Sequence, residues 1–436
     1  MRIESLSPDM YPAHVVVQRT DEVAYHQAVT DTTDSSGRVF VRVAFGIFAG
    51  QTWVRATATE LGLSDSVSYT VLPGAVTQLK VGPIDTAVYV GNTVELRAHT
   101  YDSWGNERTG DIVQWSASSG VVAATQPGVF RGMSIGRTGI HAQIGPLQDS
   151  VQLSVVPRGT IGAIYDPEGV GYPNYVAVFN TDGTGFQQVD IGALCANVLH
   201  WLPSGTGLVF DREWTRGACF TQRLYTVGLA GGTAMKLLPD STTLAEELWP
   251  NPTTDGQWIY FTGRPGYQNG EIWRVRPDGT GAERMGPAAG PSDIDQAPAQ
   301  SPNGSEVLYW SVRAGENTNH LRVINTTTRV VSDLGITGMS PSWSPAGDSI
   351  AFVRSDSFAI DHYYVAGPSG SGERLLVDVR SSNGMPSPPA WSPDGRWIAF
   401  MARDGRLALV ELATGLVLPL GWTGRLTFPT WRPEHP

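Results

Sequence analysis

A short apolar run that follows a glycine turn recurs through the C-terminal two-thirds of the chain. The clearest copy is 391–400, Trp-Ser-Pro-Asp-Gly-Arg-Trp-Ile-Ala-Phe. The glycine supplies the positive φ that a tight turn between antiparallel strands requires. The run Trp-Ile-Ala-Phe is typical of a short strand buried on both faces. Each copy therefore predicts two neighbouring strands of one sheet.

The spacing of the copies predicts a β-propeller. The turns share one glycine each, and these are Gly205, Gly256, Gly304, Gly347 and Gly395. They are separated by 51, 48, 43 and 48 residues, a period in the range of four-stranded propeller blades. A third strand such as 271–275, a second glycine turn and an outer strand complete each repeat.

The two ends of the repeat region predict how the ring closes. Residues 426–433 read as the first strand of a blade and end where the turn glycine should follow. Segments 160–165, 175–179 and 186–189 read as strands two, three and four of a blade without its first strand. Together they predict a sixth blade, closed by pairing strands from opposite ends of the domain and leaving no free sheet edge.

Alternating apolar and polar residues in the first third predict two tandem β-sandwiches. The pair of segments 50–56 and 65–73 returns as 136–142 and 149–157. Half-buried antiparallel strands alternate in this way, and each unit ends at a proline, which cannot continue a ladder. The chain is therefore expected to be all-β. The predicted domains are 1–73, 74–157 and 158–436.

Composition and charge fit an all-β protein and narrow its partners. Hydrophobic residues make up 41%, charged residues only 16%, and there are 50 glycines and 30 prolines, which suits several cores joined by tight turns. The net charge of -11 argues against nucleic acid or an anionic membrane as the main partner. No apolar run is long enough for a transmembrane helix. Charged residues interrupt 1–20, so no signal peptide is visible.

The two N-terminal units resemble bacterial immunoglobulin-like domains. Residues 74–157 are similar to the Ig-like domains of surface adhesins through 91–96, 101–106, 113–118 and 136–142. The N-terminal domain resembles the second half of an invasin-type domain through segments 32–39 and 49–50.

Residues 158–436 resemble the TolB-like six-bladed propellers, whose WD-like repeats carry Trp-Ser-Pro-Asp-Gly. Pro252 and Gln300 replace the tryptophan in the second and third copies. The resemblance implies an extracytoplasmic location, in the periplasm, at the cell surface or secreted. With no signal peptide in view, we expect a processed or truncated chain, or one whose start lies further upstream. The motif is structural and transfers no catalytic residue.

Candidate chemistry is sparse. The eight histidines show no HxH or HExxH spacing, so no zinc site is expected. The Asp-Gly turns lack a twelve-residue calcium loop and are interpreted as solvated carboxylates. We therefore predict no enzyme activity, no metal and no cofactor.

Cys195 and Cys219 are candidates for a disulfide. Both fall in loops predicted on one face of one blade, before its first strand and between its second and third. A bond would close a loop of about 25 residues and stabilise the fold by roughly 3 kcal/mol. Two unpaired thiols are the alternative, and the disulfide is favoured because exposed free thiols are a liability outside the cytoplasm.

The loops on that same face carry the candidate binding residues. Aromatic and arginine side chains on a rigid scaffold are typical of binding hot spots, although each could equally pack between blades. The candidates are Arg212, Trp214, Arg216, Arg264, Tyr267, Phe358 and His362.

Three functions stay open. The favoured one is a non-catalytic extracytoplasmic binding or adhesion protein, whose Ig-like stalk presents the propeller to a protein or peptide partner, such as one in the cell envelope. The second is an enzyme acting on a glycan or peptide, which would need a carboxylate pair or a metal at the propeller mouth. The third is a structural subunit of a surface layer or filament. The oligomeric state and the identity of the partner are not predicted.

Overall fold

The fold is all-β in a computed structural model, with one short 3₁₀ turn, η1 (Thr59–Leu61), among the described residues. The structure describes residues 2–4, 14–20, 27–40, 47–166, 175–191, 195–215, 218–230, 234–239, 243–265, 270–288, 290, 293–356, 360–380, 386–402, 405–421 and 425–434. Side chains are not described at 2–4, 14–20, 27–29, 60, 195, 212–215 and 218–221. No helix in the described ranges is long and apolar enough to cross a membrane.

The chain divides into two compact units. The first comprises Met1–Gly82, Leu96–Ser116 and His141–Ser150, and the second comprises Pro83–Glu95, Ala117–Ile140 and Val151–Pro436. The division runs through residues 74–157, so the domain boundaries expected from the sequence stay a prediction.

The N-terminal region contains a two-stranded and a four-stranded sheet. Strand β1 (Arg2–Glu4) pairs with β4 (Arg38–Phe40). The larger sheet has the order β3-β2-β5-β6 and contains β2 (His14–Thr20), β3 (Gln27–Thr32), β5 (Gly50–Ala58) and β6 (Leu63–Val71). Along β5, Thr52, Val54 and Ala56 are buried while Trp53 and Arg55 are exposed. This is the half-buried alternation that the sequence predicts.

Three more sheets follow. The first has the order β11-β10-β7 and contains β7 (Val76–Gly82), β10 (Arg97–Asp102) and β11 (Glu107–Arg108). The second has the order β12-β15-β16-β8 and contains β8 (Thr86–Tyr89), β12 (Gln114–Ala117), β15 (Gly136–Ile144) and β16 (Leu147–Val156). The third has the order β13-β14-β9 and contains β9 (Thr93–Glu95), β13 (Val122–Gln126) and β14 (Val129–Gly132). Strand β8 is parallel to β16.

A polar turn in the first unit holds three segments together. The amide of Asn106 accepts a 2.8 Å hydrogen bond from the Ala49 backbone N–H and donates a 2.7 Å bond to the Ile47 carbonyl. Its neighbour Asp102 accepts a 2.8 Å bond from the Gly74 N–H. Hydrogen bonds, first of all the one from the Asn106 side chain, hold the pKa of Asp102 well below its usual range. The turn is therefore fixed by an ionised carboxylate.

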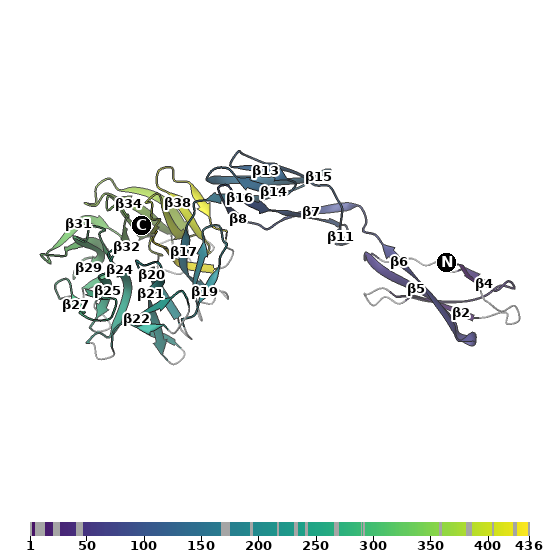
Figure 1. The fold of residues 1–436 in the computed structure, drawn as a ribbon, viewed down its shortest axis with the longest axis horizontal. Coiled ribbons are helices and arrows are strands. Elements are labelled where there is room, and N and C mark those ends of the chain that lie inside the picture. Colours follow the sequence, from purple (N-terminus) through teal and green to yellow (C-terminus); the bar gives the residue numbers. More distant parts are fainter. Residues whose placement is uncertain are drawn as a thin grey trace. The chain divides into compact units, whose positions relative to one another are not determined.

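The described part of 158–436 forms six four-stranded antiparallel sheets, the teal-to-yellow part of the ribbon (Figure 1). The first and second are β20 (Cys195–Trp201), β21 (Gly207–Thr215), β22 (Ala218–Gly228) and β23 (Met235–Lys236), then β24 (Glu246–Pro252), β25 (Ile259–Arg264), β26 (Glu271–Val275) and β27 (Glu283–Arg284). The third and fourth are β28 (Ile294–Gln300), β29 (Glu306–Val312), β30 (His320–Asn325) and β31 (Val331–Thr337), then β32 (Met339–Trp343), β33 (Ile350–Ser355), β34 (Ile360–Ala366) and β35 (Arg374–Arg380). The fifth is β36 (Ala390–Trp391), β37 (Trp397–Met401), β38 (Leu407–Glu411) and β39 (Val417–Pro419).

The sixth sheet joins strands from the two ends of this region. It contains β17 (Thr160–Asp166), β18 (Tyr175–Asn180), β19 (Gln187–Val189) and β40 (Arg425–Trp431) in the order β19-β18-β17-β40. Strand β40 pairs antiparallel with β17, which is the pairing expected from the sequence. The first strand of each sheet contacts the first strand of the next, and β40 contacts β20.

Strand β8 packs against the propeller sheets within the second unit. Ala87 and Tyr89 share a hydrophobic cluster with Trp397 and Trp431. The Tyr89 hydroxyl donates a 3.4 Å bond to the Gly159 carbonyl. The end of the preceding segment is therefore anchored on the propeller by apolar packing as well as by the chain connection.

Candidate functional site

The first strands of all six sheets line a cavity of about 540 Å³. Most of its wall consists of four sets of equivalent positions, each with one residue per sheet. The set at the repeat tryptophan is Trp201, Pro252, Gln300, Trp343, Trp391 and Trp431. The set in the following turn is Pro203, Thr254, Pro302, Pro345, Pro393 and Pro433. The cavity therefore lies at the end of the ring where the first strands lead into their turns.

The other two sets lie before the repeat tryptophan in each first strand. The set one residue before the repeat tryptophan is His200, Asn251, Ala299, Ser342, Ala390 and Thr430. The set three residues before it is Val198, Trp249, Ala297, Ser340, Pro388 and Phe428. The surface thus combines aromatic, aliphatic and proline side chains with polar ones such as Asn251, Gln300 and Ser342. Sites that bind an organic ligand or a peptide combine apolar walls with placed polar groups in this way.

A bulge in the first strands turns these residues toward the cavity. Trp249, Ala297, Ser340 and Phe428 have φ between 50° and 54°, and the pairing register shifts at all four. Such a backbone costs about 1–3 kcal/mol per residue and is found mainly where function requires it, and bulges re-aim side chains. The same strain at the same place in four sheets indicates a feature of the cavity.

Side chains of the second strands support the bulges. Asp211 on β21 is fully buried, and its two carboxylate oxygens accept a 2.7 Å bond from the Val198 N–H and a 3.0 Å bond from the Trp249 N–H. In the next sheet, Thr262 Oγ1 accepts a 3.2 Å bond from the Ala297 N–H. Asp211 therefore connects the first strands of two sheets.

Two indole groups donate hydrogen bonds within the wall. Trp201 Nε1 donates a 3.1 Å bond to the Thr430 carbonyl, and Trp391 Nε1 donates a 3.1 Å bond to Ser342 Oγ. Trp343 Nε1 and Trp431 Nε1 are buried and have no acceptor among the described residues. Buried indole N–H groups normally have a partner, so two donors in this wall lack a protein acceptor.

The cavity has little acid–base chemistry. Among the described residues that line it, Glu434 is the one acidic residue. His200 is the one histidine, and burial lowers its pKa to about 4, so the ring is neutral at pH 7. A carboxylate pair of the kind that hydrolyses glycosides is not among these described residues.

Two of the residues predicted from the sequence, Arg264 and His362, lie toward the opposite end of their strands. Arg264 ends β25, and its guanidinium donates a 2.8 Å bond to Glu246. His362 on β34 contacts Asp378 Oδ1 through Nδ1 at 2.7 Å and Asp356 Oδ2 through Nε2 at 3.5 Å. These contacts, above all the one with Asp378, raise the pKa of His362. Both side chains are thus held in ion pairs.

The remaining predicted residues are only partly covered. Arg212 and Trp214 lie in strand β21 rather than in a loop, and their side chains are outside the described residues. Arg216, Tyr267 and Phe358 fall outside the described ranges. The recognition face that these residues were expected to form stays a prediction.

The two cysteines occupy strands rather than the expected loops. Cys195 begins β20 and pairs with Glu213, and Cys219 is the second residue of β22. Strand β21 lies between them. Their side chains are outside the described residues, so the disulfide also stays a prediction.

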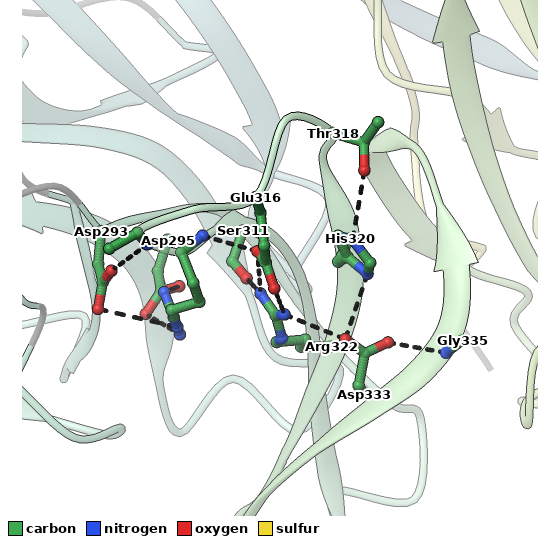
Figure 2. A network of polar contacts seen from close by, with 11 residues as sticks. Asp293, Asp295, Ser311, Glu316, Thr318, His320, Arg322, Asp333 and Gly335 are labelled. Atoms are coloured by element: carbon green, nitrogen blue, oxygen red, sulfur yellow. Dashed lines mark hydrogen bonds and ion pairs between the residues drawn. The ribbon is translucent and has the colours of Figure 1, made fainter.

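A network of ion pairs lies in the third sheet (Figure 2). Arg322 contacts Glu316 and lies 3.1 Å from Asp333 Oδ2, and His320 Nδ1 lies 3.3 Å from the same oxygen. Ligand atoms of Glu316, His320 and Asp333 are all within 4.8 Å of one another. A cation could be held by such a trio, but the Arg322 guanidinium already forms ion pairs with both carboxylates. The hydrogen bond from Arg322 also lowers the pKa of Glu316, so this network is best interpreted as structural.

A second arginine in the same sheet, Arg313, pairs with a carboxylate near the start of β28. Arg313 donates a 2.6 Å bond to Asp295 Oδ1 and a 3.2 Å bond to Oδ2 (Figure 2). Asp295 is 3% exposed, and burial raises its pKa in spite of the arginine. Fork-shaped pairing of this kind orients both groups.

The cavity was missed by the sequence analysis, although a signal was present. Five first strands carry a proline two residues before the repeat-tryptophan position: Pro250, Pro298, Pro341, Pro389 and Pro429. Proline cannot donate to a ladder and within sheets is confined to edges, strand starts and bulges. A proline repeated at one place in an inner strand therefore predicts a bulge there.

Comparison with known proteins supports the fold. No protein-family model matches the chain. The uncharacterized protein Atu1656 of Agrobacterium fabrum is 34% identical over 119 residues, which are 24% of this chain and 39% of that protein. The TolB homolog of Chlorobium luteolum is 28% identical over 163 residues, 36% of this chain and 34% of the homolog. The chain thus spans less than half the length of either relative.

A solved structure gives the broader match. TolB from Acinetobacter baumannii superposes with a TM-score of 0.52 and 15% identity, over 72% of this chain and 82% of that one. At this identity the likeness concerns the fold alone. The C-terminal region is a TolB-like β-propeller.

Proposed function

We propose that the chain is a non-catalytic extracytoplasmic binding protein whose propeller cavity accepts an extended segment of a protein or peptide partner. In this proposal residues 158–436 form a closed six-bladed propeller, and residues 1–73 and 74–157 are Ig-like domains that carry it as a stalk. The partner belongs to the cell envelope. The names of the TolB relatives agree with such a role.

One observation carries the proposal: the tryptophan and turn-proline positions of all six sheets converge on one cavity. Aromatic and proline side chains are the usual lining of grooves that bind extended or proline-rich segments. Two indole donors of this wall, Trp343 Nε1 and Trp431 Nε1, are buried without a protein acceptor. In this proposal the side chains shift on binding, so that peptide carbonyls accept their hydrogen bonds. A wall that combines aromatic and proline side chains with uncharged polar groups suits a peptide segment better than a highly charged ligand.

The enzyme alternative has less support. It would need two carboxylates or a metal at the cavity, and Glu434 stands alone as an acid among the described lining residues. His200 is neutral in the relevant pH range. The loop face with Arg264 and His362 is a second candidate surface for the same binding function.

The direct test is capture of a partner from an envelope fraction with the full chain as bait. The replacement W343F keeps an aromatic side chain at this position but removes its indole N–H donor. We expect W343F to reduce capture. Because Trp343 packs against a hydrophobic cluster and phenylalanine is smaller, the melting temperature of the variant is measured alongside, and capture is compared per folded molecule. The matched control is W104F, which replaces a tryptophan that is 60% exposed and distant in sequence from the cavity residues. It should capture the partner as well as the parent protein does. Equal capture by all three proteins would contradict binding at the cavity.

A further inference from the structure

Among the described residues, strand β6 is a long edge strand of the N-terminal sheet. It pairs with β5 along all nine residues, from Gly50↔Val71 to Ala58↔Leu63, without a shift in register. The order β3-β2-β5-β6 places no described strand on its other side. The outward N–H and C=O groups of such an edge form a template for another strand.

The buried face of the sheet continues onto β6 and is left uncovered there. Val54 is 1% exposed and Ala56 is 4% exposed. Their cross-strand partners on the same face are Val67 and Asp65, and Val67 is 43% exposed. Leu63, at the end of the same row, is 53% exposed. Apolar side chains on an inner face are therefore open to a partner.

The usual protections of an edge strand are missing. Natural edges carry lysine, proline or a bulge, or are very short. The sequence of β6, Leu-Ser-Asp-Ser-Val-Ser-Tyr-Thr-Val, has one charge and contains no lysine, proline or glycine. A strand of this kind pairs with another chain unless something covers it.

We propose that β6 pairs antiparallel with β6 of a second copy of this chain, about a two-fold axis at Val67. The strand is self-complementary in this register. Val67 lies opposite itself, and Leu63 lies opposite Val71, so apolar side chains meet on the inner face. Asp65 lies opposite Tyr69 and not opposite another carboxylate.

The outer face of β6 fits the same register. Ser66 lies opposite Ser68, and Ser64 lies opposite Thr70, so hydroxyl groups face hydroxyl groups, a favourable cross-strand pair. Both copies use the same patch, as a closed two-fold interface requires. Because β6 carries a single charge, two copies of the strand can pair without an oppositely charged partner strand.

The expected dimer is weak and depends on salt. One added strand buries less than a standard interface, which places it among transient associations. Each chain has a net charge of -11, so the copies repel each other at low ionic strength, and added salt screens that repulsion. We expect sedimentation velocity of the full chain to show a monomer–dimer equilibrium at micromolar concentrations that shifts toward dimer as salt increases.

Substitution at the axis tests the register. V67K places two like charges opposite each other and should weaken dimerisation at least tenfold. Q51K, on the exposed outer face of β5, adds the same charge away from the edge and should leave the dimer unchanged. Circular dichroism checks that both variants remain folded.

A crosslink provides a second readout. Opposite residues have Cβ atoms about 4.5–5.5 Å apart, so two V67C sites should join on mild oxidation of the full chain. Two S64C sites would lie six positions apart, about 20 Å at 3.3 Å per residue, and should not join. Cys195 and Cys219 are present in both variants, and peptide mapping locates the bond.

The outcomes decide the proposal. A salt-dependent dimer that V67K weakens, with V67C joining and S64C not joining, supports it. A chain that stays monomeric, a dimer indifferent to V67K, or equal crosslinking of V67C and S64C overturns it. None of these outcomes depends on what the propeller binds.

Discussion

Trp201 Nε1 donates a 3.1 Å hydrogen bond to the carbonyl oxygen of Thr430, 229 positions later in the chain. The indole belongs to the first strand of the first sheet, and the carbonyl belongs to the strand that pairs with β17. The contact therefore ties the beginning of the repeat region to its end.

Deleting Leu426–Pro436 should unfold the propeller cooperatively, because it removes strand β40 from its sheet and exposes the edge of β17. We expect the melting transition to fall sharply or disappear, as followed by calorimetry. The milder W201F removes the hydrogen bond and part of a buried ring, and should cost about 1 kcal/mol for the bond together with a packing loss. A deletion variant that melts as the parent does would contradict ring closure by these strands.

The strand order of the propeller could be predicted from the sequence because the turn and strand motifs that specify it are local and repeated. A turn glycine such as Gly395, followed by the run Trp397 to Phe400, specifies two strands without any knowledge of the rest of the chain. The pairing of β40 with β17 followed from the two incomplete repeats. Repetition made the inference possible, since each copy shows what the fragments lack.

The site was harder to predict because it depends on partners far apart in sequence. Arg264 and His362 could be recognised as candidate binding groups, but their ion pairs with Glu246 and Asp378 depend on strand register. The cavity likewise depends on a backbone bulge, seen at residues such as Trp249. Hydrophobic patterns specify which face of a strand is buried, and they carry little information about positive φ.

Replacing Asp211 should destabilise the propeller strongly. Both of its oxygens accept backbone hydrogen bonds at fully buried positions, and D211N would turn an amide N–H toward one of these donors. We expect a loss of roughly 2–3 kcal/mol, typical of hydrogen bonds to a charged group, measured by chemical denaturation. The control D182N alters a turn carboxylate that is not fully buried and should change stability by less than about 0.5 kcal/mol. Equal effects of the two variants would exclude a bridging role for Asp211.

His362 should add a pH-dependent contribution to stability. Its pKa is raised in the folded protein by Asp378 and Asp356, so the protonated ring stabilises the fold. That contribution is complete below the unfolded pKa of about 6.5 and is lost as pH rises through the higher folded pKa. The stability difference between the parent and H362Q should therefore shrink from acidic to alkaline pH. Thermal denaturation over a pH series measures it, and a constant difference would contradict the assignment.

The cysteine prediction can be settled by mass. A bond between Cys195 and Cys219 lowers the intact mass by about 2 Da through loss of two hydrogens. Positions two strands apart in a flat sheet are about 10 Å apart, farther than a disulfide spans. The bond therefore requires the sheet to curl where β21 turns into β22. Two thiols that both react with an alkylating agent in the oxidised, folded protein would refute the pairing.

The last prediction decides which end of the propeller binds the partner. If the loop face is used, W214A and Y267A should each weaken binding by more than about 1 kcal/mol with thermal stability nearly unchanged, as for exposed hot spots. If the cavity is used, W343F should weaken binding by about 0.5–1.5 kcal/mol, the usual contribution of one hydrogen bond, while the loop variants bind normally. Titration calorimetry with a captured partner measures both sets on folded protein. We expect the second result, because the cavity gathers one residue from each of six sheets at every level, whereas Arg264 and His362 are already engaged in ion pairs. If W214A, Y267A and W343F lower stability but each folded molecule binds normally, the three aromatic side chains are packing groups. The binding surface would then be sought on the N-terminal domains.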